Sequence, residues 1–288
     1  MGRTATPEAP IREPYDALFV DARTFLGLQP SHNPYRWHLP VTPGISTGSG
    51  FLFGGSGLGA AIEAMEGTTG RPVVWATAQY LSYARPGTVM DIDVTVAVEG
   101  HQITQARAVG HVGNVEILTV NAALGVRPLE AGGQWAEMPK GLPAPDDCAR
   151  RPLRFEVDES INTRLDVRVA KLRDFSELDG TPGDGRAVMW ARMPEVLDMS
   201  GAALAILGDY VPMGVGQALG LMAGGNSLDN TLRVTRLVPT DWVMLDIRVH
   251  AVDHGFGHGL VHLWAQDGTL LATASQSCIV RFWKQPPR

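Results

Sequence analysis

The sequence predicts an α+β fold in which one unit, a helix followed by a long antiparallel sheet, occurs twice within 288 residues. The repeat is visible in the residues themselves, because "ARPGTVMDIDVTVAVEG" (84–100) resembles "LVPTDWVMLDIRVHAVDHG" (237–255). Both segments have a proline turn, then Val-Met, then alternating Asp, Ile and Val, then a hairpin with a glycine. Alternation with a period of two indicates strands with one buried face, which a helix can cover.

The N-terminal unit, which we place at residues 16–127, contains a glycine-rich run at 48–66. Leu58, Ile62 and Met65 are spaced for one face of a helix near the end of that run. Val, Ile, Thr and aromatic residues dominate the runs that follow, and short turns with glycine separate them. The predicted strands are 73–83, 89–98, 102–112 and 115–125.

The C-terminal unit, which we place at residues 150–285, repeats this order with an apolar helix near 199–221. We predict a linker at 128–149, where Pro, Gly and charged residues follow one another without a period. A second loop at 176–186 interrupts the unit. The predicted strands are 227–238, 242–252, 259–265 and 270–282.

Composition and charge exclude several classes of protein. The chain is 44% hydrophobic with a formal net charge of -6, and we expect no nucleic-acid partner because such a partner needs a basic face. No apolar run is long enough to span a bilayer, so we expect no membrane partner. Cys148 and Cys278 are far apart and in no metal-ligand spacing, which favours a reducing cytoplasm without disulfides.

Asp209 is the residue that most needs an explanation. It lies in "ILGDYVPM" (206–213), and the segments on both sides, "MSGAALA" and "GVGQALGLMAG", are apolar. A carboxylate in such surroundings loses its hydration unless a partner compensates it. One interpretation is a solvated acid at a helix end before Pro212. The other is a general base whose proton affinity is raised by burial.

An ordered set of segments resembles one known family. The segments are "FLFGGSGLGAA", "YLSYARPG", "VMWARMP", "LAILGDYVPM", "NSLDNTLRV" and "QDGTLLATASQSCIVR". Together they are similar to the acyl-CoA thioesterases of the thioesterase II (TesB-like) family over residues 35–285, most weakly at 126–185. The resemblance implies a duplicated (double) hotdog fold, in which a sheet wraps a long helix in each half. It also implies hydrolysis of acyl-CoA to a carboxylic acid and coenzyme A.

The resemblance further implies a catalytic trio of an Asp on the second helix, a Thr or Ser on the next strand and a Gln on the last strand. These positions fall on Asp209, Ser227 and Gln276. Ser227 departs from the family's usual threonine, because it keeps the hydroxyl but loses the methyl group that restricts the rotamer. Gln276 stands in "LLATASQSCIV", where the neighbours are apolar or small and a long amide needs a partner.

This trio suits thioester hydrolysis. A carboxylate can take a proton from water, while a hydroxyl and an amide hold the water and the carboxylate at a fixed angle. We expect N–H groups of residues 54–57 to stabilise the oxyanion. Asp229 follows Ser227 by two residues on the same strand face and is a candidate supporting group. The reaction requires no cofactor and no metal.

The repeat predicts one site for the whole chain. Counting back from the shared turn prolines, Asp209 corresponds to Ser56 in the N-terminal unit. Gln276 corresponds to Ala122 or its neighbour Asn121. The N-terminal unit therefore lacks the acid, so we expect one unit to carry the reacting groups and the other to supply a wall.

Two short motifs suggest other kinds of site. "GGSGLG" (54–59) resembles a dinucleotide fingerprint but lacks a βαβ context, so we interpret its glycines as close helix–sheet packing. "DHGFGHG" (253–259) contains an acid and two histidines. It falls where the N-terminal unit has a hairpin, so we interpret it as a hairpin loop rather than a metal site.

Contacts with the remainder of an acyl-CoA substrate are left open. For the phosphates the candidates are His254, His258, Arg150, Arg151 and Arg154. For the acyl chain they are Met213, Met222 and Met244, because methionine lines adaptable apolar tunnels. Ordinary solvation and core packing explain these residues equally well.

Three functions stay open, of which the first is the acyl-CoA thioesterase. A hotdog enoyl-thioester hydratase uses an Asp and a His on the helix region, and no His lies near Asp209. A non-catalytic protein that binds acyl thioesters or an acyl carrier protein releases no thiol. The edges of an antiparallel sheet also leave a homodimer or a higher homo-oligomer open.

Overall fold

The computed structural model describes residues 21–153, 157–196 and 198–283. The N-terminal half, residues 21–125, holds two α-helices, one 3-10 turn and six strands. They are α1 (Ala22–Leu26), β1 (Gln29–Pro30), β2 (Arg36–Pro40), η1 (Pro43–Ile45), α2 (Gly54–Thr69), β3 (Val73–Tyr80), β4 (Val89–Glu99), β5 (Ile103–Val112) and β6 (Val115–Gly125). The four predicted strands of this half correspond to β3, β4, β5 and β6. The sequence analysis missed β2, whose five residues do not form a long alternating run.

The C-terminal half, residues 149–283, has the same order of a helical region followed by strands. Before that region lie β7 (Ala149–Arg150), α3 (Ile161–Arg164), β8 (Asp166–Lys171), η3 (Phe175–Glu177) and β9 (Arg186–Arg192). The helical region is α4 (Gly201–Leu207) and α5 (Val211–Leu219). The strands after it are β10 (Ala223–Ser227), β11 (Asp229–Val234), β12 (Val243–Asp253), β13 (Phe256–Ala265) and β14 (Leu270–Phe282). The predicted strand at 227–238 corresponds to β11, whereas β10, which ends at Ser227, was not predicted.

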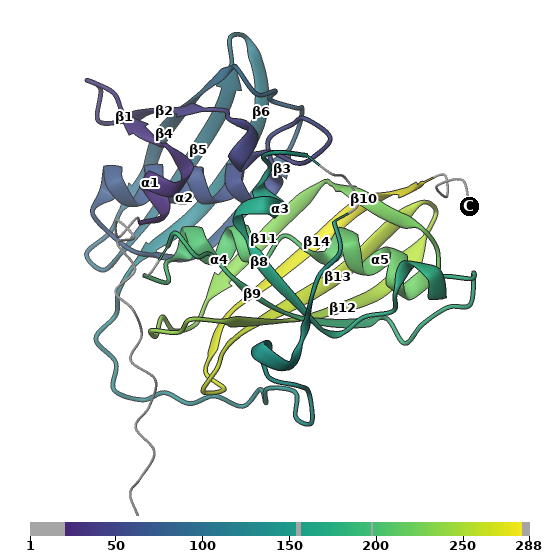
Figure 1. The fold of residues 1–288 in the computed structure, drawn as a ribbon. Helices are drawn as coiled ribbons and strands as arrows, with labels where there is room; N and C mark the ends of the chain where they lie inside the picture. Colours follow the sequence, from purple (N-terminus) through teal and green to yellow (C-terminus); the bar gives the residue numbers. More distant parts are fainter. Residues whose placement is uncertain (1–20, 154–156, 197, 284–288) are drawn as a thin grey trace, which may run out of the picture.

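All described strands belong to one antiparallel sheet (Figure 1). Its order is β1-β2-β4-β5-β6-β3-β11-β14-β13-β12-β9-β8-β7, and β10 pairs with β14 beside this path. The order of the N-terminal strands outward from β3 is repeated by that of the C-terminal strands outward from β11. The duplicated α+β fold is thus confirmed, but the two halves share a continuous sheet instead of having separate sheets.

The two halves meet where β3 pairs with β11. Thr77 pairs with Thr231 at this junction, and their hydroxyl oxygens are 2.6 Å apart. Because each strand also pairs with the corresponding strand of its own half, the registers define which residues are equivalent. Thr77 pairs with Asn121 on β6, and Thr231 pairs with Ser275 on β14. The next residue along β14, Gln276, is therefore equivalent to Ala122.

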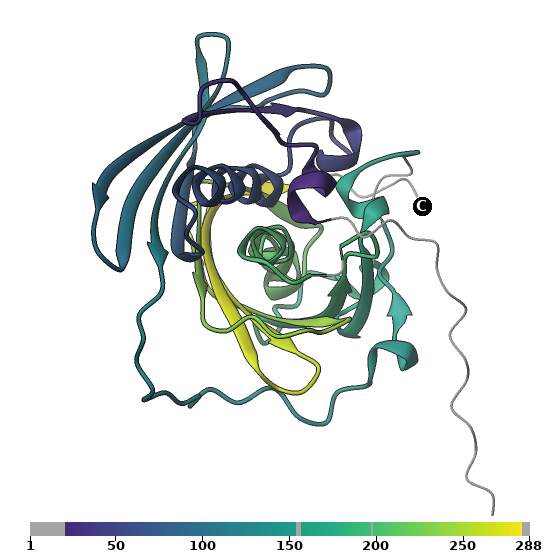
Figure 2. The ribbon, with the colours of Figure 1, turned by 90° about the vertical axis from the view of Figure 1, so that its left-hand side faces the viewer.

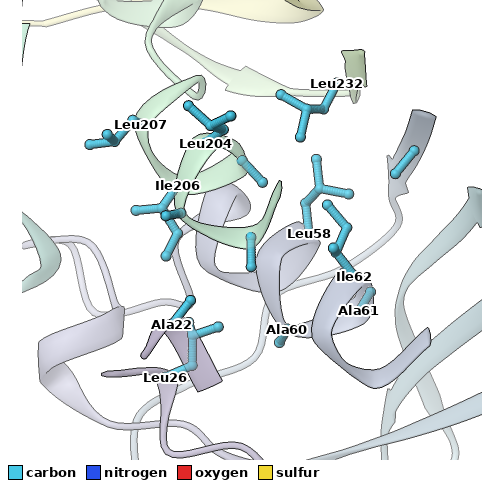
Figure 3. Close-up of a cluster of buried hydrophobic side chains, with 14 of the residues drawn as sticks. Ala22, Leu26, Leu58, Ala60, Ala61, Ile62, Leu204, Ile206, Leu207 and Leu232 are labelled. Atoms are coloured by element: carbon cyan, nitrogen blue, oxygen red, sulfur yellow. The ribbon is translucent and has the colours of Figure 1, made fainter. Parts of the chain in front are cut away.

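The helices occupy the inner face of the curved sheet. Figure 2 shows α4 and α5 nearly end-on, with the C-terminal strands bending around them. Helix α2 packs against α4, and Figure 3 shows apolar side chains from both helices meeting there. This cluster includes Leu58 and Ile62 of α2, Leu204 and Ile206 of α4, and Leu232 of β11. All five side chains are fully buried, so the cluster holds the two helices in fixed positions relative to each other.

The predicted helix at 199–221 is broken into α4 and α5. Pro212 has no N–H to bond the carbonyl of Gly208, and its ring disfavours a continuous helix at that point. Residues Gly201–Leu219 nevertheless reach the length and hydropathy of a membrane-spanning helix, which the sequence analysis did not anticipate. In the structure 78% of an 18-residue segment of this stretch is buried, and the sheet surrounds it. Its apolar character is therefore that of a core helix.

The predicted linker packs along the outer face of the C-terminal half. Ala136, Met138 and Leu142 lie against a second buried cluster that contains Trp190 and Trp264. The Trp190 indole donates a hydrogen bond of 3.0 Å to the carbonyl of Pro143. Residues 16–20, 284 and 285 of the predicted units lie outside the described residues, and the boundaries of the units stay a prediction.

Candidate active site

Asp209 lies in the break between α4 and α5. Its exposed fraction is 7%, so the solvated helix-end interpretation is wrong, although the helix break before Pro212 is real. Gly208 permits the turn because a Cβ there would come within 2.8 Å of the Ala274 Cβ on β14. The chain therefore turns close against the sheet, and this carries the carboxylate of Asp209 inward.

Three groups far apart in the sequence donate hydrogen bonds to the Asp209 carboxylate. The backbone N–H of Gly55, in the first turn of α2, donates to Oδ2 over 2.7 Å. The side-chain amide of Gln276 on β14 donates to Oδ1. The hydroxyl of Ser227, the last residue of β10, donates to the same oxygen over 3.4 Å. The structure thus brings together the three residues Asp209, Ser227 and Gln276 that the sequence analysis selected.

The environment of Asp209 raises the pKa of its carboxyl group above the ordinary value of 3.8. Burial is the largest cause, because an ionised carboxylate loses hydration there. The hydrogen bonds from Gln276, Gly55 and Ser227 favour the charged form and partly offset this effect. The group is therefore a better proton acceptor than an exposed Asp while it keeps donors that orient it.

Gln276 connects the last strand to the start of α5. Its Oε1 accepts a hydrogen bond of 3.1 Å from the N–H of Val211, the first residue of α5. Its Nε2 donates to Asp209 and also lies 3.1 Å from the Ser227 hydroxyl oxygen. Because both ends of the amide are bonded, its orientation is set, and the NH2 group must face the carboxylate.

Gly55, one of the residues expected to stabilise the oxyanion, has a different role. The N–H of Gly55 is already bonded to Asp209, so it does not point to a substrate oxygen. Position 54 requires a glycine, because a Cβ there would lie 2.8 Å from Asp209 Oδ2 and 3.1 Å from the Tyr80 hydroxyl oxygen. The positive end of the α2 dipole therefore faces the carboxylate.

Tyr80, at the end of β3, is a candidate functional residue that the sequence analysis missed. Its hydroxyl oxygen is buried and makes no hydrogen bond of regular geometry among the described residues, although the Asn230 side chain lies near enough to lower its pKa. Burial, with added repulsion from the charges of Asp209 and Asp229, raises the pKa of Tyr80 well above 10.0, so the hydroxyl keeps its proton. The segment "YLSYARPG" that begins with Tyr80 was noted only for its resemblance to the family strand.

Asp229 supports the site through the backbone of β14. Its Oδ1 accepts a hydrogen bond of 2.8 Å from the N–H of Ser277, the residue after Gln276. The expected shared strand face with Ser227 does not exist, because β10 ends at Ser227 and β11 begins at Asp229. Asp229 therefore helps to hold β14 where this strand passes Asp209.

A cavity of about 540 Å³ lies beside Asp209. Residues of both halves line it, among them Gly54, Tyr80, Asp209, Tyr210, Asn226 and Ser227. Across it, the amide of Asn226 donates a hydrogen bond to the hydroxyl of Tyr83. Gln276 is not part of the lining, so it acts on the cavity through Asp209 and Ser227.

The other residues considered for substrate contacts divide into two groups. Arg151 and Met213 line the cavity beside Asp209, and Met222 lines a neighbouring cavity. Met244 belongs to the buried cluster beneath the predicted linker, so its tunnel role is wrong. His254 lies in the turn between β12 and β13, which confirms the hairpin interpretation of "DHGFGHG".

Two further candidates can be placed briefly. His258 is on β13 and its ring nitrogen lies 3.1 Å from the hydroxyl oxygen of Ser277. Arg150 lines the neighbouring cavity, whereas Arg154 lies outside the described residues. Among residues 21–153, 157–196 and 198–283, no group of three or more His, Cys, Asp or Glu side chains could hold a metal ion.

The N-terminal half lacks an equivalent carboxylate. Ser56, the counterpart of Asp209, is fully buried within the first turn of the unbroken helix α2. The strand registers select Ala122, rather than Asn121, as the counterpart of Gln276. This half contributes Gly54 and Tyr80 to the same cavity and the Gly55 N–H to the Asp209 carboxylate, so both halves build one site.

Comparisons with known proteins identify the family and the fold. Residues 145–280 match the model of the acyl-CoA thioesterase C-terminal domain family. The structure of a candidate thioesterase from Novosphingobium aromaticivorans is 32% identical, with a TM-score of 0.78 over 87% of this chain and 97% of that chain. A comparison with curated protein sequences finds no significant match.

More distant structures share the fold. A candidate thioesterase II from Thermobifida fusca is 17% identical, with a TM-score of 0.76 over 92% of this chain and 98% of that chain. An acyl-CoA thioesterase II from Mycobacterium marinum is 19% identical, with a TM-score of 0.72 over 91% and 98% of the two chains. By its identity to the Novosphingobium protein and by its family match, the chain belongs to the double-hotdog acyl-CoA thioesterases of the thioesterase II (TesB-like) family and is a thioester hydrolase.

Proposed function

We propose that the protein hydrolyses acyl-CoA thioesters with Asp209 as the general base for an attacking water. The observation that carries the proposal is the Asp209 carboxylate itself, which is buried, raised in pKa and placed on the wall of a large cavity. A general base works best when its pKa is closer to the working pH than that of an exposed Asp.

In the proposed step, Asp209 takes a proton from water while the water oxygen forms a bond to the thioester carbonyl carbon. The carbonyl electron pair moves to its oxygen and returns as the carbon–sulfur bond breaks. The sulfur leaves with the electron pair of that bond and receives the proton, so the products are a carboxylic acid and the thiol of coenzyme A.

The neighbouring side chains have separate roles in this step. Gln276 and Ser227 hold the carboxylate, and the Ser227 hydroxyl lies at the cavity wall where it can also contact the water. The protonated Tyr80 hydroxyl belongs to a residue that lines the same cavity, and we assign it to the carbonyl oxygen as negative charge develops. Its position in the half opposite Asp209 allows the two groups to act on different atoms.

A thiol-release assay tests the proposal directly. Acyl-CoA is mixed with the protein, free thiol is followed with a chromogenic disulfide, and Asp209→Asn serves as the inactive control. Thiol release by the wild type and its loss in Asp209→Asn are expected. Wild-type turnover in Asp209→Asn contradicts the role of Asp209.

The same assay separates the remaining alternatives. With crotonyl-CoA, a hydratase consumes the double bond without releasing thiol, whereas a thioesterase releases thiol. No histidine is among the residues that line the cavity beside Asp209, which argues against the hydratase. Binding of acyl-CoA with no thiol after hours identifies a non-catalytic binder.

Location and assembly stay predictions. Cys148 and Cys278 are both free and buried, in keeping with the proposed cytoplasmic location. The sheet ends in β1 and β7, which have two residues each, so they offer little backbone for pairing with a second copy. If the protein is a homodimer or a higher homo-oligomer, we expect the contact to use other surfaces.

A further inference from the structure

A second cavity adjoins the one beside Asp209. Its volume is about 220 Å³, and it shares Arg151, Met213 and Trp283 with the first cavity. The remaining lining is largely apolar and comes from β8, the loop before β9, α5 and β10. It includes Val169, Leu172, Phe175, Leu178, Leu221 and Met222.

Two elements run from the first cavity to the second. On α5, Pro212 and Met213 line the first cavity, while Gly216 and Gln217, about one turn later, line the second. On β10, Ser227 lies at the first cavity and Ala223 at the second. The two cavities therefore follow one another along the same path, with Met213 at the point where they meet.

Three arginines line the second cavity: Arg173 and Arg151 donate hydrogen bonds within the protein, and Arg150 is exposed. Arg173 donates hydrogen bonds to the backbone carbonyls of Thr181 and Gln217. Arg151 donates to the side chain of Asn162 over 2.8 Å. Because most of the lining side chains are apolar, the interior of the cavity favours an apolar occupant over the phosphates of coenzyme A.

From these observations we infer that the second cavity binds the distal part of the substrate's acyl chain, with Met213 as an adaptable divider between the carbonyl end and the methyl end. The inference rests on the proposed function, because it assumes that the thioester carbonyl lies at Asp209. The coenzyme A arm then leaves through the first cavity, where Ser49, Asn162 and Arg281 supply polar groups. Methionine suits the divider because its unbranched thioether changes rotamer easily.

The geometry sets a chain-length threshold. Asp209 and Gly216 are separated by about 10 Å at a rise of ~1.5 Å per helical residue. An extended chain advances ~1.2 Å per bond, so about eight carbons are needed to reach the second cavity. The second cavity offers further space beyond that point. Acyl chains longer than about eight carbons should use it, and a four-carbon chain should not.

The test fills the second cavity and measures kcat/KM for acyl-CoAs of four, eight, twelve and sixteen carbons. Leu178→Trp places a larger ring in the cavity from a side chain that is 6% exposed. Leu221→Trp does so from the 38% exposed rim and serves if the first variant does not fold. Leu237→Trp, at an exposed position that lines neither cavity, is the matched control.

We expect both cavity variants to keep the wild-type kcat/KM for the four-carbon substrate. For the longest chains kcat/KM should fall about tenfold for every two methylene groups that lose their apolar surroundings. An equal decrease at all chain lengths means that the cavity binds the coenzyme A arm and overturns the inference. A wild-type profile in a folded variant also overturns it.

A binding measurement separates this inference from the proposed function. Titration calorimetry with dodecanoate, which has no thioester, reports on the acyl site whether or not the protein hydrolyses acyl-CoA. We expect Leu221→Trp to weaken dodecanoate binding at least tenfold, whereas Asp209→Asn should not weaken it, because it removes a like charge beside the carboxylate of the ligand. Unchanged binding in Leu221→Trp rules out the acyl site, whereas absence of thiol release with intact dodecanoate binding rules out only the hydrolysis.

Discussion

The inner helices of the two halves show how a duplicated fold can build a single site. In the N-terminal half, α2 continues for 16 residues without interruption. In the C-terminal half, the corresponding stretch is α4, of seven residues, and α5, of nine. The break between them places Asp209 at the cavity, whereas its counterpart Ser56 stays inside a regular helical turn.

The break between α4 and α5 provides a free backbone N–H group as well as the carboxylate of Asp209. At the start of α5 the N–H of Val211 has no partner within the helix, and Gln276 accepts its hydrogen bond. At the start of α2 the N–H of Gly55 is free in the same sense, and Asp209 accepts its hydrogen bond. Helix α2 thus stabilises the carboxylate that lies in the break between α4 and α5, so the site needs both halves.

The largest effect is expected from replacing Asp209 and, as its control, the corresponding Ser56. Asp209→Asn removes the general base, and kcat should fall by about 10³, within the range for general bases. Ser56→Ala removes a buried hydroxyl without a partner, so kcat should stay near the wild type. Steady-state thiol release measures both variants. Similar decreases in the two variants contradict the assignment of one site to the C-terminal half.

The second prediction concerns the contribution of the N-terminal half. Tyr80→Phe removes the proposed donor to the carbonyl oxygen, and kcat should fall by about 10² with a small change in KM. Tyr210→Phe is a matched control, because its hydroxyl is also buried, makes no hydrogen bond of regular geometry among the described residues, and belongs to a residue that lines the same cavity. If Tyr80→Phe changes KM alone, the hydroxyl binds substrate and does not stabilise the transition state.

The third prediction tests the amide that ties β14 to the break. Gln276→Glu replaces the donor to Asp209 with a second carboxyl group, and the repulsion between them raises the pKa of Asp209 further. We expect kcat to fall about tenfold to a hundredfold at neutral pH and the acidic limb of the pH–rate profile to move to higher pH. Gln105→Glu, at an exposed position on β5, is the control for added charge. An unshifted profile in Gln276→Glu argues against this contact.

A smaller effect is expected at Ser227. Its hydroxyl is 3.4 Å from Asp209, a long hydrogen bond whose net contribution is on the order of 1 kcal/mol, or about fivefold in rate. Ser227→Ala should therefore lose about fivefold in kcat, and Ser227→Thr should retain activity within about threefold because it keeps the hydroxyl. Complete inactivity of Ser227→Thr indicates that the cavity has no room for the methyl group.

The smallest effect is on stability and depends on pH. Because the pKa of Asp209 is raised in the folded protein, the group favours folding below its ordinary value of 3.8, and this contribution is lost as pH rises through the folded value. The free energy of unfolding of Asp209→Asn relative to the wild type should increase over that interval. Urea unfolding at several pH values measures it. If the difference in free energy of unfolding decreases with rising pH, the pKa of Asp209 is lowered in the folded protein and not raised.

Much of the fold was predictable because its signals are local. The alternation of Val, Ile and Thr and the turns after residues 84 and 252 predicted β3 to β6 and β12 to β14 with small errors at the ends. The shorter strands β1, β2, β7 and β8 form no long run of this kind and were missed. Strand β10 was also missed, because β10 and β11 pair with successive parts of β14 and only tertiary contacts reveal the one-residue shift in register between them.

The candidate site shows the same division between local and distant information. The position of Asp209 in an apolar segment and the order of the motifs were enough to select three side chains that the structure places together. Tyr80 and the bond from Gly55 to Asp209 were not predictable. Gly55 is separated from Asp209 by 154 residues, and no periodicity connects residues so far apart.

The amino-acid sequence was sufficient for the repeat, most of the long strands and the acid in an apolar segment, because periodicity, turns and hydration act over a few residues. The tertiary structure alone decided that the halves share a sheet through β3 and β11, that α2 points its first turn at Asp209, and that two cavities follow α5. These features depend on strand register and helix packing between distant segments, which only the folded chain brings into contact.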